Sequence, residues 1–284
     1  MKILLTGASG QVGYQLERSL QGLGQVVAPG RAQMDLSDLD QVRDVMRALR
    51  PGLVVNAAGY TAVDRAESEP ALAFLVNADA PAVLAREAAA LGAPMVHYST
   101  DYVFDGEKEG AYVETDVARP LNAYGQSKLA GEQAVAAAGG HHLILRTSWV
   151  YGTRGDNFLT TMLRLATERA ALRVVSDQVG APTWSRTVAD ATALILAQAR
   201  GEGALWWQQH GGICHLSCQG QTSWHGFAEA ILAAAGIDGA VAPITSDQWP
   251  AAAARPRNSV MSSARLERLC RLPDWHAALR LCLA

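Results

Sequence analysis

The first half of the chain alternates short apolar runs with longer stretches of helical pattern. Val, Ile and Leu dominate the short runs, as they do in parallel strands whose two sheet faces are both covered by helices. The alternation therefore predicts an α/β fold with a doubly wound parallel sheet. The expected strands are Lys2 to Leu5, Gln25 to Ala28, Leu53 to Asn56, Met95 to Ser99 and Leu143 to Thr147, and the expected helices are Val12 to Gly22, Leu39 to Leu49, Pro70 to Leu91 and Ala123 to Ala138.

The alternation of apolar runs and helical stretches becomes less regular after residue 150, where glycine, proline and tryptophan become frequent. We expect residues 1–150 to form the sheet domain, which the glycines discussed below make a dinucleotide-binding domain. Residues 151–284 are expected to form mainly a smaller substrate-binding lobe at the carboxyl edge of the sheet, with some segments returning to the first domain. The tract Leu205 to Gly212 fits no familiar pattern, and we interpret it as a loop at the lobe boundary or a subunit contact. The helices expected in this half are Asn157 to Glu168, Arg186 to Ala199 and Trp224 to Ala235.

Charge and composition argue against several classes of partner. With a net charge of −3 and no basic run, the chain gives no support for binding to nucleic acid or to an anionic membrane. No apolar stretch approaches the roughly 20 residues that span a bilayer, and the amino terminus opens directly on a strand-like run. We expect a cytoplasmic protein in which Cys214, Cys218, Cys270 and Cys282 are buried or half-buried free thiols rather than disulfides or zinc ligands.

Three glycines stand at Gly-x-x-Gly-x-x-Gly spacing between the first expected strand and the first expected helix. They are Gly7, Gly10 and Gly13. Glycines at this place give a tight turn, close backbone approach to a pyrophosphate and free N–H groups at the positive end of a helix. Because several strand–helix alternations follow, the pattern predicts a bound dinucleotide rather than an empty turn.

The ends of the second and third expected strands bear on which dinucleotide binds. Arg31 stands where an acidic residue would grip a ribose 2′-hydroxyl, and arginine suits a 2′-phosphate. Arg31 therefore favours NADPH over NADH, although a solvated loop arginine is the alternative interpretation. Asp35 and Leu36 could frame the adenine, with a helix-capping role for Asp35 as the alternative. Small residues that let a cofactor come close end the third strand, namely Ala57, Ala58 and Gly59.

A hydroxyl-rich strand end and a Tyr-x-x-x-Lys pair supply the candidate chemistry. Thr100 follows the fourth expected strand, while Tyr124 and Lys128 lie four residues apart on the next helix and so share a face. A ketone that receives a hydride needs a proton donor and hydrogen-bond support for its oxygen. We assign Tyr124 as the proton donor and Thr100 as the residue that orients the carbonyl. Lys128, one of only three lysines, is expected to lower the pKa of Tyr124.

With these residues identified, the chain resembles the extended short-chain dehydrogenases/reductases, and among them the reductases of 4-keto-6-deoxy sugar nucleotides. Longer phrases discriminate this branch better than the glycines do, and with the glycine segment they occur in the expected order from residue 2 to residue 259, so the likeness covers nearly the whole chain. These segments are Asn56 to Asp64, Ala66 to Pro70, Val76 to Ala78, Ser99 to Gly106, Arg146 to Gly152, Asp177 to Thr183 and Arg255 to Ser259.

The resemblance implies a Rossmann-type fold and NADPH- or NADH-dependent reduction of the C4 ketone of dTDP-4-dehydro-L-rhamnose, a sugar nucleotide that leads to lipopolysaccharide or another surface polysaccharide. The residues that it places at the cofactor are Gly10, Gln11, Val12, Asp35, Leu36, Gly59, Tyr60, Thr61, Tyr124 and Lys128. The residues that it places at the sugar are Val63, Thr100, Asp101, Tyr124 and Trp149, with a core aromatic role as the alternative for Trp149. Asp177, Thr183 and Arg255 are interpreted as structural hydrogen-bonding residues.

Two alternatives remain open at this point. The chain could be a reductase or epimerase for another 4-keto-6-deoxy sugar nucleotide, or a non-catalytic NADP-binding regulatory subunit of the same fold.

Some relatives hold magnesium between subunits through an acid in the first helix, but Gln15 stands at that position here, and a neutral amide is a poor ligand for a hard cation. We therefore do not predict metal dependence, and we consider a homodimer as the assembly.

Overall fold

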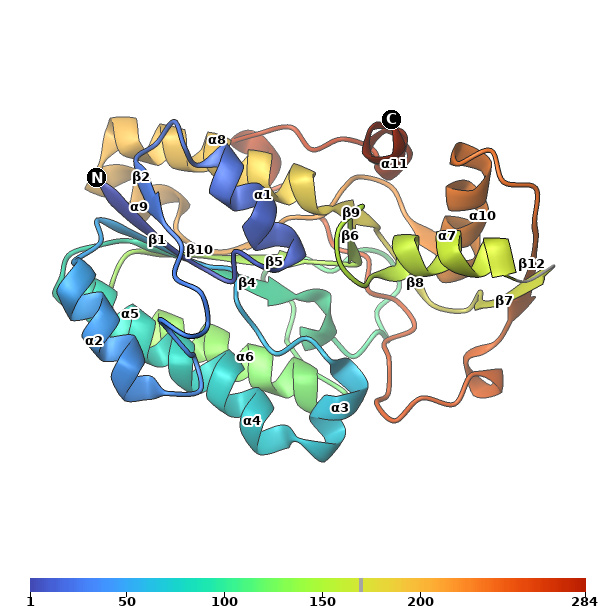
Figure 1. Ribbon diagram of the computed structural model, residues 1–284, viewed down its shortest axis with the longest axis horizontal. Helices are drawn as coiled ribbons and strands as arrows, with labels where there is room; N and C mark the ends of the chain where they lie inside the picture. The colour runs from blue at the N-terminus through green and yellow to red at the C-terminus, as the bar shows by residue number, and fades with distance from the viewer. Residues whose placement is uncertain (169–170) are drawn as a thin grey trace.

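A six-stranded parallel sheet forms the centre of the molecule in the computed structural model, which describes residues 1–168 and 171–284 (Figure 1). The chain order of the strands reverses between β1 and β3, because β2 lies on one side of β1 and all later strands lie on the other. Ligands bind at such a reversal in open α/β sheets. The strands in spatial order are β2 (Gln25–Val27), β1 (Lys2–Thr6), β3 (Leu53–Asn56), β4 (Met95–Thr100), β5 (His142–Thr147) and β10 (Gly212–His215).

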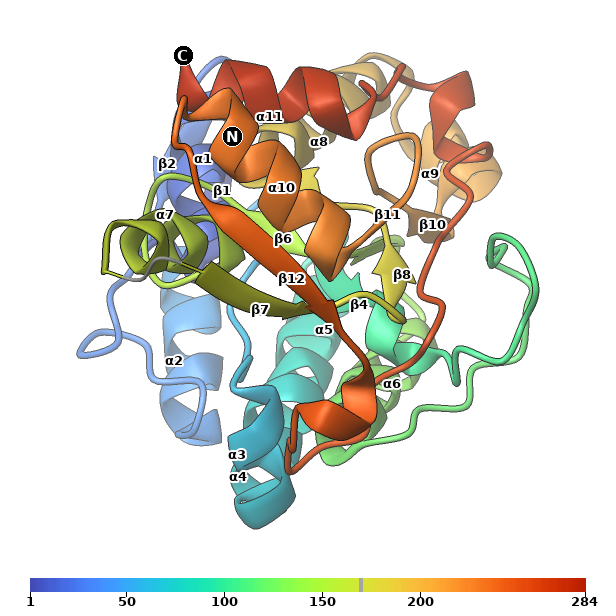
Figure 2. The same ribbon diagram turned by 90° about the vertical axis from the view of Figure 1, so that its right-hand side faces the viewer.

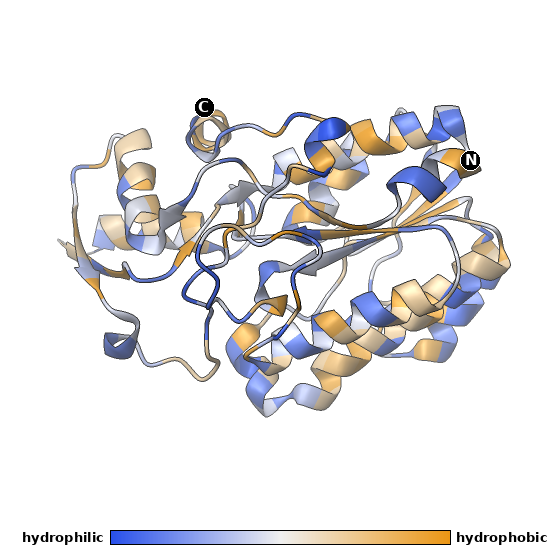
Figure 3. Cartoon of the chain, turned by 180° about the vertical axis from the view of Figure 1, so that it is seen from behind, coloured by the Kyte–Doolittle hydropathy of each residue, from blue (hydrophilic) through white to orange (hydrophobic). Residues whose placement is uncertain are grey.

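Helices cover both faces of this sheet, as the apolar strands require. Side chains alternate across a strand, so Ile3 packs with Leu16 and Val188 on one face, while Leu4 packs with Met46 on the other. Figure 3 shows hydrophobic residues along the central strands. One face carries α1 (Gln11–Ser19), α8 (Ser185–Glu202) and α9 (Ala204–His210), and the other carries α2 (Leu39–Leu49), α5 (Ala80–Ala90) and α6 (Ala123–Ala137).

The stretch expected as one helix from Pro70 to Leu91 contains a π-helical turn. It divides into α4 (Pro70–Phe74), the π-turn η1 (Leu75–Asp79) and α5. The turn places Asn77, which is fully buried, where its amide bonds to Tyr60 and Ser127. π-turns are frequent at functional sites, and this one lies between the end of β3 and α6.

The tract from Leu205 to Gly212 is not a loop, so the interpretation of it as a loop at the lobe boundary is wrong. It forms α9 and the first residue of β10, the sixth strand of the sheet, which pairs with β5. Trp206 is completely buried and Trp207 nearly so, because α9 covers the sheet at this end. Apolar burial therefore explains the paired tryptophans.

A smaller assembly at one end of the sheet has its own core around Phe227, Ile231 and Trp275 (Figure 2). The four cysteines are free and buried, as predicted. In the described residues, no helix is both long and apolar enough to cross a membrane. The other helices are α3 (Val63–Ser68), α7 (Phe158–Glu168), α10 (Trp224–Ala234), α11 (Trp275–Leu283) and the short turns η2 (Asp101–Val103), η3 (Ser246–Gln248) and η4 (Leu266–Arg268), and the other strands are β6 (Val150–Tyr151), β7 (Ala171–Val175), β8 (Val179–Gly180), β9 (Thr183–Trp184), β11 (Thr222–Ser223) and β12 (Ala240–Ile244).

Candidate functional site

The loop between β1 and α1 has the geometry that a dinucleotide pyrophosphate needs. Gly7 adopts a φ of 74°, and its carbonyl accepts a hydrogen bond from the N–H of Gly10 at 2.9 Å. Gly10 precedes α1 without any side chain that caps the helix, so the N–H groups of the first turn remain available to an anion. The side-chain oxygen Oε1 of Gln11 is buried there without a partner. These observations fit a bound diphosphate.

Gly13 is the position in this loop where a side chain fits least. A Cβ atom added to Gly13 would lie 2.0 Å from the carbonyl oxygen of Gly7. We expect Gly13→Ala to lower the free energy of unfolding by about 1–3 kcal/mol, the range for overpacking a well-packed site. Urea unfolding measures this loss, and Gly22→Ala is the matched control because nothing lies within 4 Å of a Cβ at Gly22. Equal stability of the two variants would contradict the close packing of Gly13 against the carbonyl of Gly7.

The end of β3 brings the second expected cofactor segment beside the catalytic candidates. Asn77 of η1 accepts a hydrogen bond from the N–H of Tyr60 at 2.8 Å and donates one to its carbonyl at 2.9 Å. A Cβ at Gly59 would lie 3.9 Å from Nζ of Lys128, so the backbone here runs close to that ammonium. Ala57 and Ala58 are half-buried next to the turn at Gly7. Asn77 is a supporting residue to which the sequence analysis gave no role.

The residues expected at the adenosine follow β2 and differ in their exposure. Arg31 is exposed, and Leu36 is buried in the core between the sheet and α2. The Asp35 carboxylate accepts hydrogen bonds from the N–H and the hydroxyl of Ser37, which together with the nearby Arg31 hold its pKa below the usual value. Asp38, not Asp35, caps α2 through the N–H of Gln41. The capping role considered for Asp35 is therefore wrong.

Thr100 and Asp101 lie at the carboxyl end of β4, where both are buried. The Thr100 hydroxyl donates to Oδ1 of Asp101 at 3.0 Å and accepts from the N–H of Tyr102 at 3.2 Å. The other carboxylate oxygen of Asp101 is buried without a partner. Burial raises the pKa of Asp101 to about 6, and the nearby hydroxyl groups of Ser259 and Thr100 oppose this shift. A buried carboxylate oxygen without a partner is available to accept a hydrogen bond from a hydroxyl group of a ligand.

The raised pKa of Asp101 predicts how stability depends on pH. The folded protein holds the proton up to about pH 6, whereas the unfolded chain releases it near the ordinary carboxyl pKa of 3.8. Because the folded state binds more protons in this window, this group stabilises the fold below pH 4 and loses that contribution as pH rises through 6. Between pH 4 and 7.5, we expect the free energy of unfolding of Asp101→Asn to rise by up to about 3 kcal/mol relative to that of the wild type. Urea unfolding of both proteins at each pH measures the gain, and a constant difference would refute the shift.

Tyr124 and Lys128 lie in the first two turns of α6, whose amino-terminal end is fixed by Asn122 and packs closely on η2. Asn122 caps the helix by accepting from the N–H of Gly125 at 2.8 Å and donates to the carbonyl of Ala254 at 2.7 Å. The absence of a side chain at Gly125 is required, because a Cβ there would lie 2.2 Å from the carbonyl oxygen of Tyr102. Tyr124 is half-buried and Lys128 is buried, and the Thr100 hydroxyl lies close enough to Tyr124 to affect the pKa of its phenol. The structure thus brings the three catalytic candidates together.

The expected lowering of the Tyr124 pKa is wrong for this structure. Burial raises the pKa of Tyr124 to about 12, and the nearby Thr100 hydroxyl acts in the opposite direction. Lys128 instead donates a hydrogen bond to the carbonyl of Tyr98 at 2.6 Å, and burial lowers the pKa of Lys128 to about 8. The resting phenol therefore keeps its proton near neutral pH, which is the state a proton donor needs.

Trp149 lies two residues beyond Thr147, the residue of β5 that pairs with Thr100. Its backbone adopts a φ of 46°, an unusual conformation for a bulky residue that is frequent at functional sites. The indole stacks on Trp224 at 3.5 Å and fills the space beside Gly180. Trp149 is therefore a rigid wall at the same edge of the sheet. Val63 begins α3 and is half-buried.

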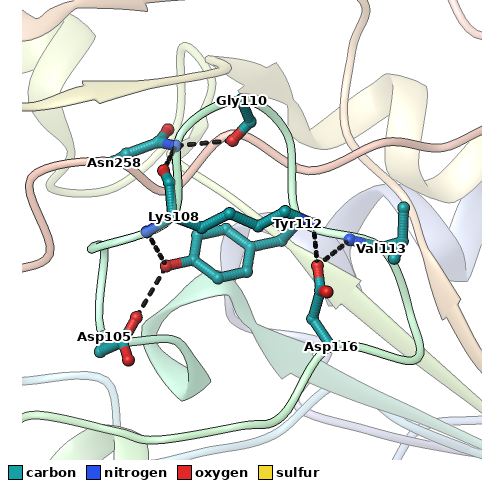
Figure 4. Close-up of polar contacts among 7 residues, drawn as sticks. All are labelled: Asp105, Lys108, Gly110, Tyr112, Val113, Asp116 and Asn258. Carbon is teal, nitrogen blue, oxygen red and sulfur yellow. Dashed lines mark hydrogen bonds and ion pairs between the residues drawn. The ribbon is translucent and has the colours of Figure 1, made fainter.

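The segment from Arg255 to Asn258 connects the smaller assembly to the site. Arg255 forms a bidentate ion pair with Asp64 of α3, with N–O distances of 2.8 and 2.7 Å. Asn258 donates hydrogen bonds to the carbonyls of Lys108 and Gly110, in the loop that follows Thr100 (Figure 4). Asp105 and Lys108 also bond to the hydroxyl of Tyr112 in that loop. Arg255 thus has the structural hydrogen-bonding role that was expected.

Asp177 and Thr183 also make structural hydrogen bonds, as predicted. Asp177 accepts from the N–H and the hydroxyl of Ser246. The Thr183 hydroxyl donates to the carbonyl of Ala181 and accepts from the N–H of Cys218.

Comparison with known proteins places the whole chain among sugar-nucleotide enzymes. The family model described as RmlD substrate binding domain matches residues 1–284. The chain is similar to the dTDP-4-dehydrorhamnose reductase of Burkholderia thailandensis, with 51% identity over 100% of this chain and 98% of the relative, and to that of Escherichia coli K12, with 41% identity over 99% and 96%. Among solved structures, a dTDP-4-dehydrorhamnose reductase from Bacillus anthracis in complex with NADP has a TM-score of 0.90 at 35% identity, over 99% of this chain and 98% of that one.

Proposed function

The chain belongs to the RmlD substrate binding domain family, and from this premise we propose that it reduces the C4 ketone of dTDP-4-dehydro-L-rhamnose to dTDP-L-rhamnose with NADPH, the last step of dTDP-L-rhamnose biosynthesis. Two relatives that the chain matches over 98% and 96% of their length are dTDP-4-dehydrorhamnose reductases, and another enzyme of that name was solved with NADP. The observation that carries the proposal is the meeting of Thr100, Tyr124 and Lys128 beside the backbone of Gly59.

The proposed mechanism assigns a separate task to each of these side chains. When bound, NADPH supplies the hydride. The Tyr124 phenol, protonated at neutral pH, donates its proton to the ketone oxygen as charge develops there. The Thr100 hydroxyl holds that oxygen by a hydrogen bond. The Lys128 ammonium lies on the same helix face and favours the phenolate once the proton has left.

The surrounding residues have binding roles in this proposal. Asp101 accepts a hydrogen bond from a hydroxyl of the sugar, and Trp149 and Val63 form walls of the sugar site. The cofactor lies along Gly7, Gly10, Gln11, Val12, Gly13 and the segment Ala57 to Thr61, with Asp35 and Leu36 at the adenosine and Arg31 at the 2′-phosphate. Residues 1–150 form the dinucleotide-binding domain, and most of residues 151–284 form the lobe that holds the sugar nucleotide.

A kinetic assay with purified sugar nucleotides tests the function. We expect NADPH oxidation with enzymatically prepared dTDP-4-dehydro-L-rhamnose and much slower oxidation with its unepimerised precursor, the 4-keto sugar of the D series. Product NMR should identify dTDP-L-rhamnose. Oxidation only with a different keto-sugar would favour a sister reductase, and cofactor binding without oxidation on any substrate would favour a regulatory subunit.

A further inference from the structure

Arg154 lies on a loop that faces the glycine-rich turn across a cavity. The cavity has a volume of about 520 Å³ and is lined by Ser9, Gly10, Gln11 and Thr61 on the cofactor side, and by Arg154, Gly155 and Asp156 on the other. The first group consists of the turn before α1 and the end of the expected cofactor segment after β3. The second group is the loop between β6 and α7.

Hydrogen bonds hold this loop in one shape. The side-chain amide of Asn157 donates to the carbonyls of Gly152, Arg154 and Gly155, at 2.8, 3.3 and 3.2 Å. The Thr160 hydroxyl also donates to the Gly155 carbonyl, at 3.1 Å. Three carbonyls gathered by one side chain define the backbone on both sides of Arg154. The loop therefore fixes the point from which the Arg154 side chain extends.

The guanidinium group of Arg154 is held at the amino-terminal end of α1. Its central carbon lies 4.2 Å from the ring centroid of Tyr14, and Arg18 lies over the same ring at 3.4 Å. Among the described residues, Arg154 forms no ion pair with a carboxylate. Its donors thus remain available, next to the uncapped first turn of α1.

We propose that Arg154 is a ligand of the cofactor diphosphate, bound across the cavity from the N–H groups at Gly10 to Val12. The inference rests on the proposed function, because it assumes a dinucleotide at this turn. A planar guanidinium can form two charge-assisted hydrogen bonds to phosphate oxygens. The helix end supplies N–H donors from the opposite side. Asp156 lines the same cavity and opposes an anion, so Arg154 also offsets that charge.

Binding of truncated ligands tests this assignment without any catalytic readout. NADPH, NADH and ADP-ribose contain the diphosphate, whereas 2′-AMP does not. We expect Arg154→Ala to raise the Kd of the first three by a common factor of about tenfold to hundredfold, the range for a hydrogen bond to a charged group. The Kd of 2′-AMP should not change. Calorimetric titration measures all four, and thermal melting confirms that the exposed substitution leaves the fold intact.

Matched variants separate this contact from general electrostatics. Arg18→Ala removes the other arginine that lies over Tyr14. Because Arg18 does not line the cavity, this substitution should leave all four affinities unchanged. Arg31→Ala should weaken NADPH and 2′-AMP only. Unchanged ADP-ribose binding by Arg154→Ala, or an equal loss for 2′-AMP, would overturn the assignment. If wild type binds neither NADPH nor ADP-ribose, the proposed function itself fails; if wild type binds both and the Arg154 variant binds equally well, only this inference fails.

Discussion

Replacement of Tyr124 by phenylalanine is expected to lower kcat by about 10²- to 10⁴-fold, the usual contribution of a positioned general acid. The substitution removes the hydroxyl and retains the ring, so the packing against Tyr102, at 5.7 Å between centroids, should persist. A ketone that accepts a hydride without a proton donor must leave its oxygen charged in a buried site. Steady-state kinetics with saturating NADPH measures the loss.

The Kd of NADPH separates a chemical defect from a binding defect in this variant. We expect Tyr124→Phe to bind NADPH within about threefold of wild type, which is less than 1.4 kcal/mol. Tyr102→Phe is the matched control, because Tyr102 contacts Tyr124 but belongs to the adjoining turn η2. Its turnover should remain near the wild-type value. Full turnover by Tyr124→Phe would remove the phenol from the mechanism.

The second large effect is expected at the buried ion pair between Glu132 of α6 and Arg146 of β5. The guanidinium donates two hydrogen bonds to the carboxylate, at 2.8 and 2.6 Å, and the two side chains are only 3% and 2% exposed. Removing one charge of such a pair leaves the other buried without compensation. We therefore expect Glu132→Gln to lower the free energy of unfolding by about 3–5 kcal/mol, as measured by urea denaturation.

Two controls show whether the unpaired charge causes that loss. The double variant Glu132→Leu with Arg146→Met removes both charges and should recover most of the stability. Glu168→Gln breaks the exposed pair with Arg164, whose side chains are 49% and 61% exposed, and should cost less than about 1 kcal/mol. A double variant as unstable as Glu132→Gln would indicate lost packing rather than lost charge balance.

Much of the sheet domain could be predicted from the sequence, because its signals are local. The apolar runs gave five of the sheet's strands to within one or two residues, and α2 begins and ends as expected at Leu39 and Leu49. The π-turn Leu75–Asp79 was not predictable, because its residues suit an ordinary helix and only the tertiary contacts of Asn77 favour the turn. The strand Gly212–His215 was missed because it is short and two glycines precede its apolar residues.

The site divides in the same way between local and tertiary information. The spacing of Tyr124 and Lys128 placed both on one helix face, and the strand end located Thr100 near them. The direction of the Tyr124 pKa shift could not be read from spacing, because it depends on burial by segments distant in the chain. The contact of Lys128 with the Tyr98 carbonyl is likewise a product of how α6 docks on β4. Arg154 carries no motif that could have drawn attention to it.

The most direct test of the central claim follows a label through the reaction. NADPH carrying deuterium at its transferable position is incubated with dTDP-4-dehydro-L-rhamnose and the wild-type protein, and the product is read by NMR. Delivery of hydride to the carbon whose oxygen Tyr124 protonates predicts dTDP-L-rhamnose with deuterium at C4. Consumption of the labelled cofactor with deuterium at any other carbon, or with none in the sugar, would contradict the account.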